Sequence, residues 1–161
     1  MSERTYRVYA DTSVFGGVFD DEFATSSRMF FDQVASGRFV LVTSALVQAE
    51  LDVAPDEVRQ LFDDMIIRAE ITPISEVAQR LQQAYLAAGI VTAKWATDAL
   101  HVALATVSGC ELIVSWNFKH IVHFEKIPLY NAVNTLEGYR AMAIYSPREV
   151  ISYGNNNDET S

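Results

Sequence analysis

Four side chains with oxygen donors stand where an α/β domain would gather them. Asp11 follows a short apolar segment near the N-terminus, and Asn117 follows a second apolar run much later in the chain. Glu50 and Asp98 lie between these two positions, in segments with helical patterns. Side chains from distant parts of a chain meet at the carboxyl ends of parallel strands. Their oxygens suit a hard divalent cation such as Mg²⁺, which keeps bound water. The set predicts a metal-dependent hydrolase.

Each of the four residues also has a purely structural interpretation. Asp11 can cap the turn that follows it, and Asn117 can serve as a loop or cap residue. Glu50 can be a surface carboxylate, because Asp52 shows that its helix has a solvated side. Asp98 is favoured near the first turn of its helix by the helix dipole. The combination of the four is therefore more informative than any one of them.

The elements that must position these residues alternate between strands and helices. Short apolar or aromatic runs predict strands at 8–10, 39–42, 112–114 and 143–145. Helical patterns fill most of the intervals, at 21–35, 44–53, 55–69, 75–88, 95–107 and 128–139. This alternation predicts an α/β fold with a central parallel sheet covered by helices. We expect one domain over 1–151 and a mobile C-terminal tail over 152–161.

The composition fits a soluble domain. The chain has 161 residues, half of them hydrophobic, which is enough for one substantial core. It has no apolar stretch of the ~18 residues that a membrane span needs and no signal-peptide core at its start, so we expect a cytoplasmic protein without a membrane partner. The single cysteine, Cys110, cannot form an internal disulfide and is expected to be buried.

The charge balance is unusual for a protein that binds nucleic acid. The formal net charge is −9, whereas phosphate binding normally draws on clustered Lys and Arg. Lys94, Lys119 and Lys126 lie close in sequence to Asp98 and Asn117, so local cations can accompany an acidic metal site. An acidic surface also favours a basic protein partner.

The order of these motifs resembles that of the PIN-domain ribonucleases, above all the VapC-type toxins of bacterial toxin-antitoxin systems. The resemblance spans roughly residues 6–151. Its motifs are Asp-Thr-Ser at 11–13, a helical Glu50, Asp-Ala-Leu-His-Val-Ala-Leu-Ala at 98–105 and Glu-Leu-Ile-Val-Ser-Trp-Asn at 111–117. The last two motifs are the most specific. The resemblance implies a three-layer α/β/α fold and an acidic pocket for one or two Mg²⁺ or Mn²⁺ ions.

The resemblance also assigns roles to individual residues. Asp11, Glu50 and Asp98 match the acidic positions of the family, and Asn117 stands where the family often has Asp. That departure removes a negative charge but keeps a carbonyl oxygen, which implies weaker metal binding or a single ion.

Two serines lie beside the proposed ligands. Ser13 and Ser115 could orient a bound water or a carboxylate, or act as ordinary turn hydroxyls. As a PIN-domain relative, the chain would hydrolyse RNA phosphodiester bonds as an endonuclease, a cognate antitoxin would block its groove, and a homodimer would be compatible with this role.

Other interpretations stay open. A phosphatase could use Asp11 as its nucleophile, although Ser13 stands where such enzymes carry a second Asp. A non-catalytic PIN-like scaffold could bind RNA or protein without cutting. Trp95 and Trp116 could stack on RNA bases or pack in the protein. A zinc site is not expected, because nothing in the sequence places the three histidines His101, His120 and His123 together.

Overall fold

The fold is built on a five-stranded sheet in which every strand pair is parallel. The structure is a computed structural model, and it describes residues 4–153. The strand order is β3-β2-β1-β4-β5. The strands are β1 (Tyr6–Ala10), β2 (Phe39–Ser44), β3 (Ala69–Thr72), β4 (Leu112–Val114) and β5 (Ala143–Tyr145). The first strand is therefore central, and Asp11, which directly follows it, lies at the middle of the sheet's carboxyl edge.

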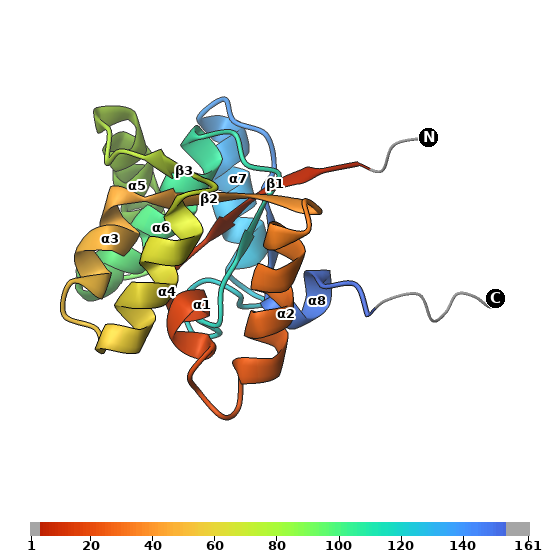
Figure 1. Cartoon of the computed structure of the whole chain (residues 1–161). Helices are drawn as coiled ribbons and strands as arrows, with labels where there is room; N and C mark the ends of the chain where they lie inside the picture. Colours follow the sequence, from red (N-terminus) through yellow and green to blue (C-terminus); the bar gives the residue numbers. More distant parts are fainter. Residues whose placement is uncertain (1–3, 154–161) are drawn as a thin grey trace.

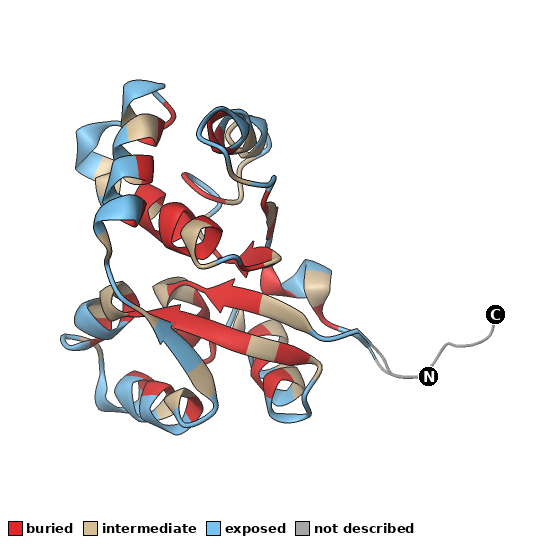
Figure 2. Cartoon of the chain, turned by 90° about the horizontal axis from the view of Figure 1, so that it is seen from above, coloured by how far each residue is buried: buried red, intermediate tan, exposed pale blue. Residues whose placement is uncertain are grey.

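Helices cover the sheet on both sides, as Figures 1 and 2 show. They are α1 (Thr12–Gly17), α2 (Ala24–Ala35), α3 (Ala45–Leu51), α4 (Asp56–Ile66), α5 (Glu76–Ala87), α6 (Ala96–Val107), α7 (Ile127–Leu136) and α8 (Pro147–Val150), with a short 3₁₀ turn, η1 (Ala93–Trp95), before α6. The helices α5 and α6 pack together, and α2 packs against β2 and α8. This arrangement confirms the predicted three-layer α/β/α fold.

Apolar and polar residues alternate little along the strands, because the sheet is buried on both faces. Val8, Tyr9 and Ala10 of β1 are fully buried, as expected for a parallel strand covered on both faces. The helix α6 is buried almost all round from Ala99 to Thr106, which matches its high apolar content. Asp98 lies just before this buried stretch and is only half-buried. Thus α6 holds Asp98 on a rigid, deeply packed element.

The structure departs from the sequence prediction mainly in short elements. The helix expected over 55–69 ends at Ile66, and Ala69 begins β3, which was not predicted. This strand lies at the edge of the sheet, and its Glu70 and Ile71 are exposed, so it lacks an apolar signal. The helices α1 and α8, of six and four residues, were also missed, because each is too short to show a helical pattern of apolar residues.

The end of the described chain is attached to the domain. The backbone N–H of Ser152 donates to Gln33 Oε1 at 3.0 Å, and Gln33 Nε2 donates to the Ser152 carbonyl at 2.7 Å. Most of the expected mobile tail, residues 154–161, lies outside the described residues, so that expectation stays a prediction. None of the helices within 4–153 has the length and apolar character that crossing a membrane requires.

Candidate functional site

Asp11 is the N-cap residue of α1 and is held by two serines. Its Oδ1 accepts hydrogen bonds from the backbone N–H and the hydroxyl of Ser13, at 3.1 and 2.6 Å. Its Oδ2 accepts from the Ser115 hydroxyl at 2.5 Å. Burial raises the pKa of Asp11, and the charge of His101 and the serine hydrogen bonds oppose that rise. Asp11 thus performs the capping role, while its carboxylate is fixed at the carboxyl edge of the sheet.

The same serines connect Asp11 to the chain that leaves β4. Ser13 Oγ accepts from the backbone N–H of Trp116 at 2.8 Å, and Ser115 Oγ accepts from the backbone N–H of Asn117 at 2.9 Å. Each hydroxyl therefore accepts a hydrogen bond from a backbone N–H and donates one to Asp11. Of the roles that the sequence left open, orienting a carboxylate is the one this geometry fits.

Glu50 lies on α3 and points toward α1 and α6. Its Oε1 accepts a hydrogen bond from the Thr12 hydroxyl and another, at 2.8 Å, from His101 Nε2. Burial acts to raise the pKa of Glu50, but the hydrogen bond and charge of His101, with the Thr12 hydrogen bond, outweigh it and leave the pKa below its ordinary value. Glu50 is therefore not a free surface carboxylate.

His101 contacts the candidate site, and the sequence did not identify it. It is buried in α6, and its Nδ1 lies 2.8 Å from the Tyr9 hydroxyl while its Nε2 contacts Glu50. Since an ionised carboxylate only accepts, Nε2 must carry a proton. The Tyr9 hydroxyl also lies 2.8 Å from Ser44 Oγ. A continuous hydrogen-bonded chain therefore joins β2, β1, α6 and α3.

A sequence signal for His101 did exist. Residues three apart on a helix share a face, so His101 lies on the same side of α6 as Asp98. Tyr9 and Asp11 likewise have the spacing of one strand face. Considering the histidines only as zinc ligands concealed this relation.

Asp98 has a different environment from the other two carboxylates. Within residues 4–153 its carboxylate accepts no hydrogen bond, whereas both Asp11 and Glu50 accept several. Its charge acts on His120, whose pKa is lowered by burial and raised in part by Asp98. Asp98 is therefore the least constrained carboxylate of the set.

Asn117 acts chiefly as a cap in the structure. Its side-chain Oδ1 accepts a hydrogen bond from the backbone N–H of His120 at 2.9 Å, and its backbone carbonyl accepts from Ile121 and Val122. This geometry is the loop or cap role left open by the sequence. One lone pair of Oδ1 remains for another partner.

The donor set fits a hard cation held in an open site. The carboxylates of Asp11, Glu50 and Asp98 provide oxygen ligands of the kind that Mg²⁺ and Mn²⁺ prefer. Among the described side chains, no group of three or more His, Cys, Asp or Glu residues is placed so that it could hold a metal ion. Mg²⁺ is usually bound through one or two carboxylates and retains several waters, so it needs no more than two of these carboxylates as direct ligands.

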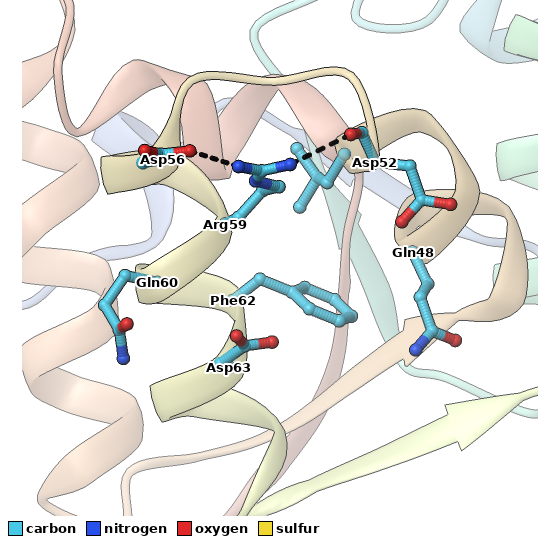
Figure 3. Close-up of a pocket in the computed structure, with 8 residues that line it drawn as sticks. Gln48, Asp52, Asp56, Arg59, Gln60, Phe62 and Asp63 are labelled. Carbon is cyan, nitrogen blue, oxygen red and sulfur yellow. Dashed lines mark hydrogen bonds and ion pairs between the residues drawn. The ribbon is translucent and has the colours of Figure 1, made fainter.

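A separate pocket lies between α3 and α4, and Figure 3 shows its lining. It has a volume of about 540 Å³ and contains none of the proposed ligands. Its one basic side chain, Arg59, is bound to Asp56 and to the Asp52 carbonyl. The arginine is already paired and none of the proposed metal ligands lines this pocket, so it is not part of the candidate site at the carboxyl edge of the sheet.

Comparisons with known proteins identify the fold. No protein-family model matches the chain, and no curated protein does. A chain from the crystal structure of VapBC2 from Rickettsia felis, bound to a DNA fragment from its promoter, aligns with a TM-score of 0.55 and 14% sequence identity, covering 86% of this chain and 96% of that one. FitAcB from Neisseria gonorrhoeae gives 0.54 and 14%, covering 89% and 99%.

A further solved structure aligns less well. VapC20 from Mycobacterium tuberculosis, a sarcin-ricin loop cleaving toxin, gives a TM-score of 0.49 and 13% identity, covering 70% of this chain and 92% of that one. The first two likenesses establish the fold alone, because the sequence identities are low. The chain has the PIN-type fold of VapC proteins, as the sequence motifs predicted.

Proposed function

We propose that this chain is a metal-dependent endoribonuclease, with Mg²⁺ or Mn²⁺ held by Asp11, Glu50 and Asp98, and that it acts as the toxin of a type II toxin-antitoxin pair. One observation carries the proposal. On a PIN-type fold, Asp11 and Glu50 are each fixed by hydrogen bonds at the carboxyl edge of the sheet, and α6 brings Asp98 to the same side as His101.

The residues of the chain divide the work between positioning and proton transfer. A bound divalent ion supplies an activated water and stabilises charge on the RNA phosphate. Ser13 and Ser115 hold the Asp11 carboxylate in one orientation, and Thr12 with His101 does the same for Glu50. Such fixed groups need little rearrangement during the reaction.

Asp98 is our candidate for accepting the proton of the attacking water. The lowered pKa of Glu50 makes it a weaker base, and both Asp11 oxygens already accept hydrogen bonds. The Asp98 carboxylate accepts none within 4–153 and is half-buried, which leaves it accessible to water. Asn117 would assist only through the lone pair that His120 does not use.

The residues argue against an aspartyl phosphatase, because Ser13 stands where such enzymes carry a second Asp. The Ser13 hydroxyl donates to Asp11 Oδ1 at 2.6 Å, so it orients this carboxylate and does not replace the missing acid. A non-catalytic scaffold remains the second candidate, favoured by the capping role of Asn117. Metal-dependent cleavage distinguishes the scaffold from the nuclease.

The decisive experiment measures cleavage of single-stranded RNA by the purified full chain. Cleavage should require Mg²⁺ or Mn²⁺, stop in excess EDTA and return when the metal is restored. Asp98→Asn should lower the rate by about a hundredfold or more with an unchanged Tm, because it removes a carboxylate with little change of shape. Asp63→Asn on the exposed face of α4 is the matched control and should cleave normally.

Two results would reject the nuclease. Cleavage that persists in EDTA would exclude the metal mechanism. Absence of cleavage by the wild-type chain in Mg²⁺ and Mn²⁺, across a panel of RNA substrates, would favour the scaffold.

A further inference from the structure

The lysines of this acidic chain are concentrated in one place. The sequence has only three, Lys94, Lys119 and Lys126, against a formal net charge of −9. Lys94 Nζ lies 5.2 Å from the centre of the Trp95 ring, and Lys119 Nζ lies 5.5 Å from it. The charges of Lys126 and Lys119 both act on His120, which packs on the same indole. Lys94 and Lys119 therefore lie over one indole, and Lys126 is near enough for its charge to act on the histidine that packs on it.

The positive charges of two of these lysines are free of carboxylate partners. Four arginines form ion pairs with Asp or Glu, whereas within residues 4–153 no lysine does so. Lys94 and Lys119 are exposed, and Lys126 Nζ donates to the Ile90 carbonyl at 2.5 Å. Lys94 and Lys119 make cation–π contacts with the Trp95 ring, and because no carboxylate binds either ammonium group, an external anion can compete for both.

The indole between them is held in place from behind. The Trp95 and His120 rings are stacked, with centroids 4.6 Å apart and an angle of 28° between their planes. His120 is 8% exposed, and neither of its ring nitrogens has a hydrogen-bond partner among the described residues. Burying unpaired ring nitrogens costs free energy. The stacking on Trp95 is the favourable contact that His120 gains from its buried position. Trp95 itself stays partly exposed.

This patch, formed by Lys94, Trp95, Lys119 and His120, borders the proposed active site. Trp95 is the N-cap residue of α6, whose first turn carries Asp98, and the Asp98 charge acts directly on His120. Lys119 and His120 follow Asn117 in the turn after β4. The patch therefore lies close to Asp98.

We propose that this patch is a subsite for single-stranded RNA, in which Lys94 and Lys119 bind backbone phosphate and Trp95 stacks on one unpaired base. Ammonium groups bind phosphate by charge, and an aromatic face takes a base of any sequence. An acidic peptide could satisfy the lysines but would make little use of the indole. The inference rests on the proposed function, because it takes RNA as the substrate of the adjacent site.

The test measures binding of a labelled single-stranded oligoribonucleotide to the full chain by fluorescence anisotropy in EDTA, so that no cleavage occurs. The double variant Lys94→Gln/Lys119→Gln should raise the Kd about tenfold or more. Its slope of log K against log salt should be smaller by about 1.4, at about 0.7 for each lost phosphate contact to a single strand. Trp95→Leu should weaken binding about tenfold, as expected for one lost base stack.

The matched control removes the same charge elsewhere. Arg59→Gln/Arg80→Gln also makes the net charge more negative by two, but these arginines pair with Asp56 and Glu76 on α4 and α5. Its RNA affinity should stay close to that of the wild type. Tryptophan fluorescence is a second measurement: RNA should quench it in the wild type and much less in Trp95→Phe, which keeps only the buried Trp116.

The results separate this subsite from the nuclease itself. Equal weakening by the lysine pair and the arginine pair would overturn the subsite, as would unchanged binding by Trp95→Leu or tighter binding of poly-glutamate than of RNA. Cleavage by the wild type with no effect of the patch variants would reject the subsite and keep the nuclease. Patch-dependent RNA binding without cleavage in Mg²⁺ would keep the subsite and reject the nuclease.

Discussion

At the scale of single residues, the three carboxylates differ in how strongly hydrogen bonds fix their positions. Asp11 and Glu50 are each bound by at least two donors, so their positions are set by the fold before any ligand arrives. Asp98 is held only by the packing of its helix. If these carboxylates bind a divalent ion, as we propose, the site combines a preorganised side with an adaptable one, which suits an ion that must exchange water during a reaction.

His101 should control how well Glu50 serves as a ligand. His101→Leu removes one of the two donors to Glu50, leaving only Thr12, and leaves the buried Tyr9 hydroxyl with only Ser44 as a partner. We expect Mn²⁺ affinity, measured by calorimetry without RNA, to fall about tenfold or more, as for other residues that orient a metal ligand. Stability should fall by about 1–3 kcal/mol because buried polar groups lose partners.

A conservative replacement distinguishes positioning from general damage to the core. His101→Gln can still donate to Glu50, so it should recover part of the metal affinity even if its Tm stays low. Equal metal affinity in wild type, His101→Leu and His101→Gln, all measured below their Tm, would remove His101 from the site.

Cys110 should be chemically silent in the folded chain. It is 5% exposed, and burial raises the pKa of its thiol above the ordinary value of 9.0. The reactive thiolate is therefore disfavoured, and a disulfide-exchange reagent at pH 8 should react far more slowly with the native chain than with the chain in denaturant. Rapid reaction of the native protein would contradict the buried position.

The raised pKa of Cys110 determines in which direction its contribution to folding stability changes with pH. A raised folded-state pKa means that the folded chain retains the Cys110 proton more strongly than the unfolded chain does. Its contribution to stability is complete below pH 9.0 and decreases as the pH rises toward the folded value. Cys110→Ala should therefore lose less stability than the wild type between pH 8.5 and pH 10, as measured by urea unfolding.

At the scale of elements, Arg7 ties the edge of the sheet to the end of α6. Its guanidinium donates to the Ser108 and Gly109 carbonyls at 2.9 and 3.0 Å and pairs with Glu70 of β3 at 2.5 Å. Arg7→Met should lower the free energy of unfolding by about 1–2 kcal/mol, because the partly exposed side chain loses several charge-assisted hydrogen bonds. Chemical denaturation measures the change.

The control for Arg7 is a more exposed ion pair. Arg80→Met breaks only the contact with Glu76 within α5, at 3.6 Å, and should cost less than about 0.5 kcal/mol. If the two variants were equally stable, Arg7 would not connect these elements energetically.

The elements that the sequence predicted are those with a strong apolar signal. The runs at 112–114 and 143–145 match β4 and β5, and long amphipathic patterns located α2 and α5 within a few residues. The edge strand β3 and the short helix α1 were missed, since tertiary context decides them. Strand pairing with β2 places Ala69–Thr72, and the Asp11 cap begins α1.

The candidate site could be proposed from residue types, but its hydrogen-bonded connections could not. Asp11, Glu50, Asp98 and Asn117 were selected by their order along the strands and helices, and their role stays a prediction. The Tyr9–His101–Glu50 chain joins three elements across the core, and only the packing of β1, α3 and α6 brings those side chains together. The helical spacing of Asp98 and His101 was the one local clue.

At the scale of the whole molecule, the charge of the chain bears on the antitoxin that we propose as its partner. The described fold aligns with chains of the VapBC2 and FitAcB structures over most of its length. Its formal charge of −9 is opposite in sign to that of a basic segment. A basic antitoxin would be steered toward such a surface.

The final prediction concerns that association. If the chain is a toxin, a small protein encoded beside it should bind it and relieve any growth inhibition that it causes. The association rate should fall steeply as salt is raised from about 50 to 500 mM, because screening weakens steering between opposite charges, while the dissociation rate should change much less. Stopped-flow mixing measures both rates, and Asp98→Asn, which retains the fold, allows the toxin to be prepared without its partner. An association rate independent of salt would show that the acidic surface does not guide the encounter. A neighbouring protein that neither binds the chain nor relieves growth inhibition would refute the toxin-antitoxin role and leave the proposed nuclease activity unaffected.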